Sequence, residues 1–538
     1  MKILFTLFIL AVSFSAFAQN EASYLLFLKD KTGTSYSTDS PEEFLSAKAI
    51  ERRNKSNIEI TNQDLPLSKI YTDSILNLGP EIIAKSKWLN TVTIRTADKQ
   101  LIDTITKIAF IDSVLLTKPG ATSKSARSKF NINAPQKVAA YDSAFYGSSW
   151  QQIKLHRGQL LNHHGFKGKG IEIAVLDAGF YRVNELAAFD SIRMNNQILG
   201  TRDFVYPKQD VYTQHQHGMQ VLSTIAANLP NKLVAPATKA KFWLLRSEDD
   251  NSEYQIEEDF WIAAAEFADS VGVDIITSSL GYTEFDDSTM NYTPAQMNGK
   301  TARITNGANI AAQKGILVVN SAGNEGGKAW KVIGAPADGE HVMAVGGVYP
   351  SGVRVYFSSV NSNHGFVKPN VMSVGAQTQG ISPSGEVTDM YGTSFSCPLL
   401  TALAACLWQA LPEKNNFEIK ALIEQISDRY ETPDKEYGYG IPDFFKPLST
   451  KYSSTAKNAT SQLSVSNNPF HNTLTISGTQ SIKTIAFFNL NGQRLFQLSP
   501  NGNDKVQINT SLFKNYKGVV VVQAKTANSI ETLKLIRK

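Results

Sequence analysis

The chain has 538 residues, of which 42% are hydrophobic and 19% charged, and its formal net charge is +5. These fractions are typical of a folded globular protein and exclude a disordered or membrane-embedded chain, and the length allows two or three domains. From Lys451 onward there are eleven Lys or Arg and only two acids, so the part before Lys451 is net acidic. This asymmetry indicates that the two parts meet different partners.

The N-terminus has the pattern of a secretory signal peptide. Lys2 precedes an apolar run over residues 3–14, and Ala16-Phe17-Ala18 supplies a small-residue cleavage site. The run is short for a membrane span, and no other segment has enough unbroken apolar residues to cross a bilayer. We therefore predict a signal peptide over residues 1–18, an exported protein, and no transmembrane segment once the signal is removed.

Residues 19–120 are predicted to form a small α+β domain. The expected strands are Tyr24–Leu28 and Thr91–Arg95, and the expected helices are Pro41–Arg53 and Lys99–Ile108. Residues 121–149 are predicted to be a linker, because residues 118–137 are rich in Lys, Arg, Ser, Ala and Asn. A proteolytic cut could fall in this basic stretch.

Strands and helices alternate in the next part of the chain, residues 150–448. Short apolar strands separated by helices predict a parallel sheet covered on both faces, which is an α/β fold. The expected strands are Ile171–Leu176, Lys241–Leu245, Val273–Ser278, Gly315–Asn320 and His341–Val348. The expected helices between them include Glu257–Ser270 and Thr301–Lys314.

Two candidate catalytic groups lie at the ends of these elements. Asp177 follows an apolar strand, at the sheet edge where ligand sites collect in α/β folds, although an Asp before Gly also starts ordinary turns. His217, in His215-Gln216-His217-Gly218, opens a helix and is compatible with a solvated pair, a metal pair or a catalytic base. A lone His-x-His pair is weak evidence for zinc. As a base, His217 needs a carboxylate to fix its tautomer and a hydroxyl to deprotonate.

Two further groups complete the set. Asn324 follows a buried-type strand and could stabilise an oxyanion, although Asn at a turn often serves its own backbone. Ser394 lies between a Gly-Thr turn and the apolar helix Leu399–Leu411, where a serine is commonly just a helix cap. The order Asp, His, Asn, Ser, with each group at a strand end or helix start, favours nucleophilic catalysis by Ser394.

These residues resemble the subtilisin-like serine peptidases, the subtilases. The likeness is carried by Val-Leu-Asp177-Ala-Gly, His217-Gly-Met-Gln-Val, Ser-Ala-Gly-Asn324 and Gly-Thr-Ser394-Phe-Ser-Cys-Pro, and it spans about residues 150–447. It implies a subtilisin-like sheet, a triad of Asp177, His217 and Ser394, and Asn324 in the oxyanion hole. It also implies that the segments Ser279-Leu280-Gly281 and Ala322-Gly323 bind the substrate.

The resemblance implies a secreted serine endopeptidase that acts on proteins or peptides. It also implies that residues 19–120 act as a propeptide, although a permanently attached accessory domain is the alternative. Ala178, Met219-Gln220 and Leu233 depart from the family's usual residues, and a catalytically inactive surface-binding relative is the alternative function. An esterase or lipase is disfavoured, because it would have a Gly-x-Ser-x-Gly elbow and its catalytic histidine would come last in the chain.

No cofactor is expected to be required for this chemistry. Family members often bind structural calcium, and the loop of residues 282–300 carries Glu284, Asp286 and Asp287. Acidic loops are usually only solvated, so calcium is unsupported by the sequence and no metal ligand is assigned.

The C-terminal part is predicted to be a β-sandwich over residues 467–538, after a Ser-, Thr- and Asn-rich linker over 449–466. Short strands are expected at 474–477, 484–489, 506–509 and 519–524, with a hairpin turn at Asn491-Gly492. Asn468-Pro469-Phe470 and the terminal Lys-Leu-Ile-Arg-Lys resemble the sorting domain of the type IX secretion system. This implies a Gram-negative bacterium, export through the periplasm by that machinery, and a secreted or cell-surface protein. The lysines are scattered rather than clustered, so no nucleic-acid partner is expected.

Overall fold

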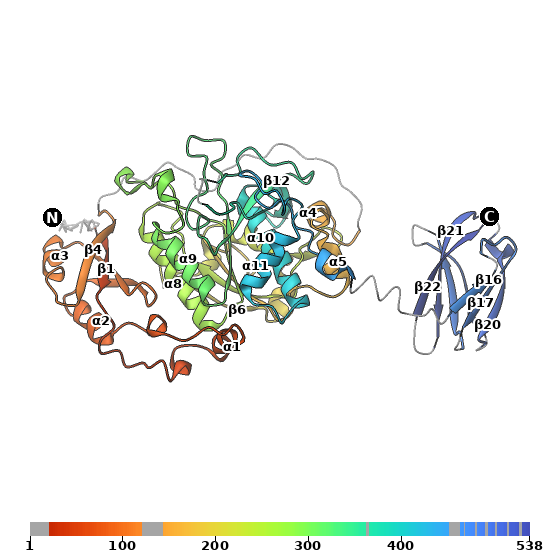
Figure 1. The fold of residues 1–538 in the computed structure, drawn as a ribbon, viewed down its shortest axis with the longest axis horizontal. Helices are drawn as coiled ribbons and strands as arrows, with labels where there is room; N and C mark the ends of the chain where they lie inside the picture. Colours follow the sequence, from red (N-terminus) through yellow and green to blue (C-terminus); the bar gives the residue numbers. More distant parts are fainter. Residues whose placement is uncertain are drawn as a thin grey trace, which may run out of the picture. The chain divides into compact units, whose positions relative to one another are not determined.

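The computed structural model describes residues 21–120, 144–361, 365–450, 463–466, 468–478, 481–489, 493–500, 503–513, 516–526 and 530–537. The chain divides into two units, Met1–Lys446 and Pro447–Lys538 (Figure 1). The predicted signal peptide and the Asn491-Gly492 turn lie outside the described residues, as does most of both predicted linkers.

The first unit begins with a four-stranded antiparallel sheet in the order β2-β3-β1-β4. Its strands are β1 (Ala22–Leu28), β2 (Glu81–Ser86), β3 (Thr91–Thr96) and β4 (Ile111–Lys118), and its helices are α1 (Ala47–Lys55), α2 (Lys69–Leu76) and α3 (Lys99–Ile105). Its own small core contains Leu26, Ile75, Val92 and Ile105, so these residues form an α+β layer that buries one face of the sheet.

A seven-stranded parallel sheet forms the centre of the unit, in the order β13-β12-β11-β10-β5-β9-β6. Its strands are β5 (Glu172–Asp177), β6 (Ile198–Asp203), β9 (Lys241–Arg246), β10 (Ile275–Ser278), β11 (Leu317–Ser321), β12 (Met343–Val348) and β13 (Val371–Val374). The inner strands are apolar and buried on both faces, which is the pattern of a parallel sheet covered by helices. The predicted fold class is confirmed.

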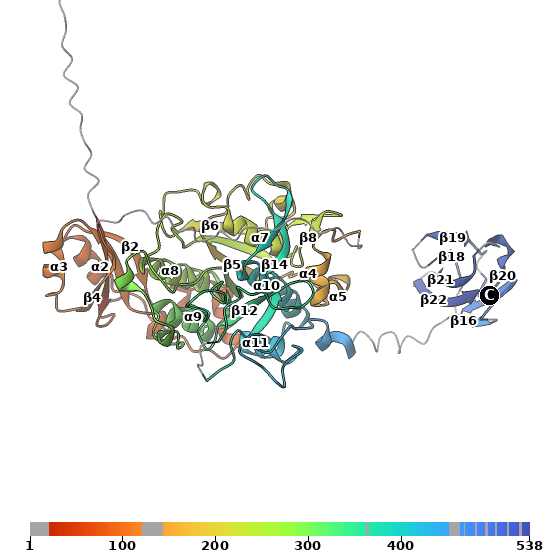
Figure 2. The same cartoon turned by 90° about the horizontal axis from the view of Figure 1, so that it is seen from above.

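Helices cover both faces of this sheet (Figures 1 and 2). They are α4 (Trp150–Leu155), α5 (Gly158–His163), α6 (Asp190–Met194), α7 (His217–Ala226), α8 (Ile256–Val271), α9 (Arg303–Gln313), α10 (Thr393–Ala410) and α11 (Asn416–Gln425). Two hairpins complete the unit: β7 (Asn228–Leu229) with β8 (Leu233–Val234), and β14 (Ala376–Ile381) with β15 (Val387–Tyr391).

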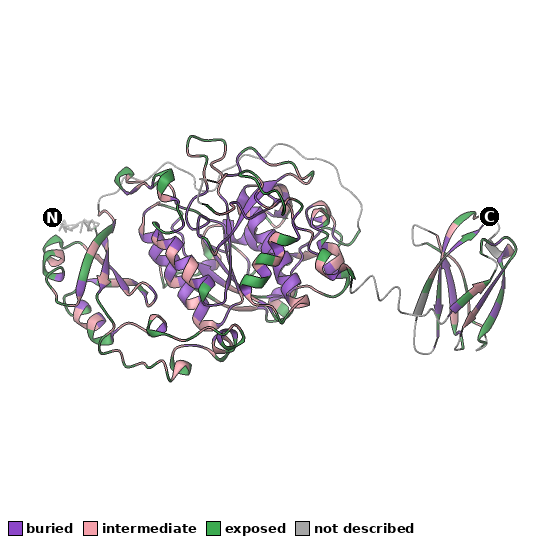
Figure 3. Ribbon diagram, in the orientation of Figure 1, coloured by how far each residue is buried: buried purple, intermediate pink, exposed green. Residues whose placement is uncertain are grey.

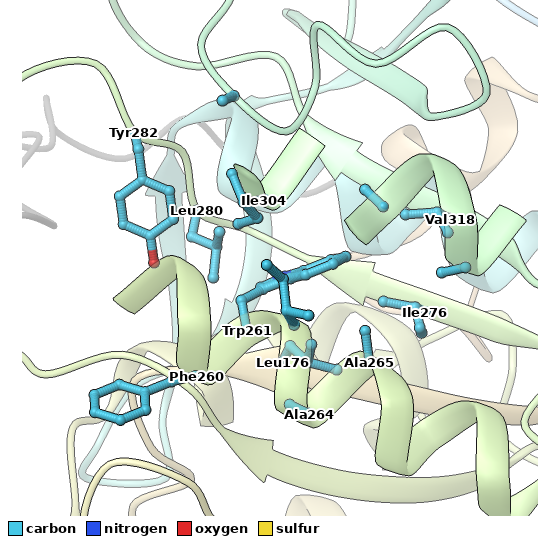
Figure 4. Packing of buried hydrophobic residues seen from close by; sticks show 14 of the residues in the cluster. Leu176, Phe260, Trp261, Ala264, Ala265, Ile276, Leu280, Tyr282, Ile304 and Val318 are labelled. Atoms are coloured by element: carbon cyan, nitrogen blue, oxygen red, sulfur yellow. The ribbon is translucent and has the colours of Figure 1, made fainter. Parts of the chain in front are cut away.

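The main core lies between the sheet and helices α8 and α9. Trp261 of α8 lies among Leu176, Ile276 and Val318, which come from three neighbouring strands (Figure 4). Buried residues gather in the sheet and in the flanking helices (Figure 3). The central strands therefore form a rigid base for the loops at their carboxyl ends.

The structure differs from the predicted elements mainly at the edges. The expected helix Pro41–Arg53 is a 3-10 turn at Pro41–Glu43 followed by α1, because Ser46 caps the new helix by accepting from Ala49 N at 3.2 Å. The edge strands β6 and β13 were not predicted. The residues of β6 include Gly200 and the exposed Thr201 and Arg202, so they lack the apolar run that marks the inner strands.

The N-terminal layer and the parallel sheet domain share buried ion pairs. Asp269 of α8 is fully buried and binds both Arg52 and Arg53 of α1. Arg53 Nη1 also donates to Asp64 Oδ1 at 2.9 Å, and Lys314 Nζ contacts Asp64 Oδ2 at 3.0 Å. Because a buried charge that loses its partner is strongly destabilising, these pairs fix one docking geometry.

The second unit is a β-sandwich, as predicted. A three-stranded sheet, β16 (Leu463–Ser466), β17 (Thr473–Gly478) and β20 (Lys505–Asn509), packs on a four-stranded sheet in the order β19-β18-β21-β22. The latter comprises β18 (Thr484–Phe488), β19 (Arg494–Leu498), β21 (Gly518–Lys525) and β22 (Ile530–Arg537). Leu474, Ile485, Phe487 and Val520 form its core. Among the described residues of the whole chain, no helix is long and apolar enough to cross a membrane.

Candidate active site

The candidate catalytic residues meet at the carboxyl edge of the parallel sheet. Asp177 is the last residue of β5, Ser279 follows β10, and Asn324 follows β11. These three strands are neighbours in the sheet, so their ends are brought together although up to 147 positions separate the residues in sequence. Helices α7 and α10, which begin with His217 and Thr393, pack against each other and start at the same edge.

Asp177 and His217 form a buried pair. Asp177 Oδ1 lies 2.8 Å from His217 Nδ1, and both side chains are at most 5% exposed. The carboxylate also accepts from Ala178 N at 2.8 Å, a bond that needs only the backbone and so tolerates alanine at this position. The hydrogen bond to the carboxylate holds the imidazole proton on Nδ1 and leaves Nε2 as the basic nitrogen.

Ser394 lies in the first turn of α10, in a half-buried position, and its Oγ donates to the Ser279 carbonyl at 3.3 Å. Gly392 starts the turn with φ of +136°, which favours glycine, and the ring of Phe395 lies 5.9 Å from the imidazole. Pro398 stands four residues after Ser394 and has no N–H, so the Ser394 carbonyl cannot receive its usual helical bond. Ser279 Oγ donates to that carbonyl at 2.8 Å instead, which holds the backbone of Ser394 at the end of β10.

Asn324 is held by the residue that precedes Ser394. Its Oδ1 accepts from Thr393 N at 2.9 Å and from Thr393 Oγ1 at 3.1 Å, while Gly323 N donates to the same hydroxyl at 3.1 Å. Because Oδ1 is engaged, Nδ2 is the group of the amide that remains for a ligand. The N–H of Ser394 is among the first four of α10 and has no acceptor within the helix.

A cavity of about 140 Å³ opens beside Ser394 and Asn324. Its walls include all five residues predicted to bind substrate: Ser279, Leu280, Gly281, Ala322 and Gly323. Leu280 is 8% exposed and joins the main core, so this wall is anchored in the packed interior (Figure 4).

The sequence reasoning missed three glutamates that also line this cavity: Glu248, Glu253 and Glu325. Glu248 is 3% exposed and accepts a hydrogen bond from the Tyr282 hydroxyl. Burial, and then the Glu248 carboxylate, hold the pKa of Tyr282 well above its usual value, so the phenol remains a donor. In the sequence, Glu248 and Glu253 are marked only by their place in an acidic stretch after β9, and such stretches are typical of solvated loops.

The structure assigns local roles to the other groups weighed for a metal. His215 Nδ1 accepts from His217 N at 3.2 Å, and burial, followed by the charge of His217, lowers the pKa of His215. In the acidic loop, Asp286 Oδ2 accepts from Glu253 N at 3.0 Å and Asp287 caps a short 3-10 helix. Asp286 therefore holds the backbone of a neighbouring loop, and Asp287 holds the backbone of its own loop.

The two cysteines are both buried and free. Burial raises the pKa of each thiol to about 12, so neither forms a thiolate near neutral pH. Cys397 of α10 packs at the end of β10, with Sγ 3.4 Å from Thr277 Oγ1, and this contact helps to hold the helix against the strand. A thiolate is the nucleophilic form of cysteine, so neither cysteine is a nucleophile near neutral pH.

Comparisons with known proteins agree with this geometry. The profile of the subtilase family (Peptidase S8) matches residues 168–440, a Peptidase S8 propeptide domain of Bacteroidota matches 23–132, and a secretion system C-terminal sorting domain matches 464–538. Subtilisin NAT from Bacillus subtilis subsp. natto and subtilisin E from Bacillus subtilis (strain 168) are each 29% identical over 300 residues, covering 55% of this chain and 69% of theirs. A thermophilic serine proteinase from Bacillus sp. (strain AK1) is 29% identical over 273 residues, or 50% of this chain and 60% of its own.

Proposed function

Because the chain belongs to the subtilase family of serine endopeptidases, we propose that Asp177, His217 and Ser394 are its catalytic triad. The observation that carries the proposal is the buried 2.8 Å contact between Asp177 Oδ1 and His217 Nδ1 next to the first turn of α10. The chain also carries a C-terminal sorting domain and is a secreted or cell-surface protein.

In the proposed reaction, Ser394 Oγ attacks the carbonyl carbon of the scissile peptide bond while His217 Nε2 takes its proton. Asp177 keeps the imidazole oriented and stabilises the imidazolium. The resulting oxyanion accepts hydrogen bonds from Asn324 Nδ2 and the Ser394 N–H. His217 then gives the proton to the leaving nitrogen as the C–N bond breaks, which leaves an acyl-enzyme.

A water molecule completes the cycle. His217 Nε2 removes one of its protons as the water oxygen attacks the ester carbon, and the same proton returns to Ser394 Oγ when the ester bond breaks. All of these steps use only side chains, backbone N–H groups and water, so no step of the proposed reaction uses a cofactor. Substrates are proteins or peptides that pair with the backbone of residues 279–281.

Labelling by a fluorophosphonate tests this function directly. A serine activated by a base becomes phosphonylated, whereas a catalytically inactive relative does not react. We expect the matured protein to gain the mass of one phosphonyl group, located by peptide mapping on Ser394. An unlabelled protein that also leaves casein intact would show that the chain is an inactive surface-binding relative.

Replacing Asn324 with alanine is expected to lower kcat by about 10²–10³ with a small change in KM. The Nδ2 group is proposed to stabilise charge that develops only in the transition state, and such donors contribute this much in subtilisin. The measurement is steady-state hydrolysis of a peptide amide, with the exposed Asn195→Ala as the control. A large rise in KM with unchanged kcat would show instead that Asn324 binds the ground state.

We propose that residues 19–120 are an inhibitory propeptide that stays docked through the buried ion pairs on Asp269. Replacing Asp269 with asparagine is expected to weaken inhibition of the matured enzyme by the added N-terminal domain, residues 19–120, about 10²-fold or more. The change removes the carboxylate that Arg52 binds and one of the two that Arg53 binds, and breaking a buried ion pair costs about 3–5 kcal/mol.

The inhibition constant, determined from the rates at several concentrations of the N-terminal domain, measures this effect. Asp434→Asn is the matched control, because it removes the same charge from an exposed pair with Arg429 on the same domain. An exposed pair contributes about 0–1 kcal/mol, so this variant is expected to be inhibited as strongly as the wild type. Equal inhibition constants for both variants would rule out the Asp269 pairs as the docking determinant.

A further inference from the structure

The cavity beside Ser394 has room for one side chain. Its volume of about 140 Å³ is close to the roughly 150 Å³ of an engineered cavity that binds benzene. Ser394 and Asn324 are among its lining residues, so a side chain that enters it belongs to a residue next to the scissile bond of the proposed reaction. The chemistry of the remaining walls therefore decides after which residue the peptide is cut.

Those walls are acidic. Among the described residues that line the cavity, three are glutamates and none is a lysine, arginine or histidine. Glu325 also pairs with the exposed Lys328 at 3.0 Å, whereas Glu248 is nearly inaccessible to solvent and Glu253 is half-buried. A carboxylate in such surroundings attracts a cation far more strongly than one in water, because the local dielectric constant is low.

Glu257 adds a third carboxylate next to this pair. Carboxylate oxygens of Glu248, Glu253 and Glu257 all lie within 4.8 Å of one another. Glu257 Oε1 accepts from Tyr254 N and Oε2 from Asp249 N, both at 3.1 Å. Its oxygens therefore hold the backbone of residues 249–254, while Glu248 and Glu253 line the cavity and Glu248 Oε1 also accepts from the Tyr282 hydroxyl. This donor set fits a cationic side chain better than Ca²⁺, which takes 6–8 oxygen ligands.

The same loop already holds a lysine of the N-terminal domain. Lys118, the last residue of β4, places Nζ 3.6 Å from Asp249 Oδ2 and 3.0 Å from Ser252 Oγ. The ammonium also lies 5.4 Å from the centre of the Tyr254 ring, within the range of a cation–π contact. The loop of residues 248–254 thus binds a basic side chain of a polypeptide segment, and its residues Glu248 and Glu253 line the cavity.

From these observations we propose that Glu248 and Glu253 select a lysine or arginine as the residue on the amino side of the scissile bond. This proposal rests on the proposed function, because it names the substrate class of the same site. The ammonium or guanidinium group would lie between the two carboxylates, and its aliphatic stem would pass along Leu280 and Ala322.

Matched peptide amides test this selectivity. The matured enzyme would be assayed with four substrates that differ only at that residue: lysine, its uncharged analogue norleucine, arginine, and its uncharged analogue citrulline. We expect kcat/KM to be about 30-fold or more higher for each charged residue than for its analogue, since removing one partner of a buried charge pair costs at least this much. Equal values would overturn the proposal and leave the peptidase intact.

Glu253→Gln and Glu248→Gln are each expected to lower the lysine-to-norleucine ratio about 30-fold. Glu284→Gln is the matched control, because Glu284 is exposed and does not line the cavity. Each variant would be expressed with its N-terminal domain and trimmed with an added protease, so that folding and maturation do not depend on the altered pocket. A ratio that is unchanged in both cavity variants would overturn the proposal.

Binding of p-aminobenzamidine separates this proposal from the proposed function. The Ser394→Ala protein should bind this arginine analogue, and Glu253→Gln in the same background should weaken binding at least tenfold. If the wild type hydrolyses nothing and takes no fluorophosphonate, the triad proposal fails, and the binding result alone decides the selectivity. Stoichiometric Ca²⁺ binding that is lost in Glu253→Gln and excludes p-aminobenzamidine would overturn the proposal in favour of a metal site.

Discussion

Replacing Ser394 with alanine is expected to lower kcat for peptide hydrolysis by about 10⁶, the loss that accompanies removal of the serine in subtilisin. The reason is that the serine hydroxyl forms the covalent bond to the substrate, and alanine offers no atom that could replace it. The residue left behind still closes the first turn of α10, so the fold and substrate binding should persist.

Intact mass and casein digestion, each followed on the full chain, measure this loss. If the peptidase matures itself, only the wild type should release the N-terminal domain, and the mass of the product gives the position of the cut. Ser384→Ala, an exposed serine before β15, is the control and should mature like the wild type. An alanine variant that still digests casein would show that another group is the nucleophile.

Maturation by a second protease would produce a different pattern. In that case neither the wild type nor Ser394→Ala releases its N-terminal domain. Trimming both proteins with an added protease then restores casein digestion to the wild type alone, so the two explanations remain distinguishable.

The elements that could be predicted from the sequence are those whose residues fit only one type of secondary structure. The run from Ile173 to Leu176 is apolar at every position, because β5 is buried on both faces by helices, and such a run has no alternative as a surface element. Edge strands are different. β6 has only one neighbouring strand and carries exposed polar residues, so its residues follow neither the alternating nor the continuous apolar pattern.

The candidate site divides in the same way. Asp177, His217, Asn324 and Ser394 each stand at the end or start of a regular element, so their positions on one sheet edge follow from the order of strands and helices. Glu248 and Glu253 lie in an irregular loop after β9, three positions from β11 in the sheet, and they line the cavity only in the folded chain. No local pattern distinguishes them from solvated acids, so only the tertiary structure identifies them.

The departures from the family's usual residues are also understood only in the folded chain. Ala178 supplies its backbone N–H to Asp177, so a side-chain hydroxyl at this position is dispensable for that contact. Met219 is fully buried on α7 and serves the packing of that helix. Both substitutions therefore preserve the Asp177–His217 pair, which argues against reading them as signs of an inactive relative.

Asp177→Asn is expected to lower kcat by about 10⁴ while leaving KM nearly unchanged. An asparagine keeps the size of the side chain, but its amide cannot hold the imidazole proton on Nδ1 or stabilise the imidazolium, and the equivalent change in a serine protease triad has this effect. The assay is steady-state hydrolysis across pH, with the exposed Asp190→Asn as the control.

The double variant Asp177→Asn, Ser394→Ala provides the decisive comparison. Asp177 is proposed to act only through His217, and His217 only through the hydroxyl of Ser394, so the carboxylate has no catalytic role once that hydroxyl is gone. We therefore expect the double variant to be no slower than Ser394→Ala alone, because residues that act as a unit are strongly non-additive. A further 10⁴-fold loss in the double variant would mean that Asp177 supports activity by a route independent of the serine, and the triad would have to be reassigned.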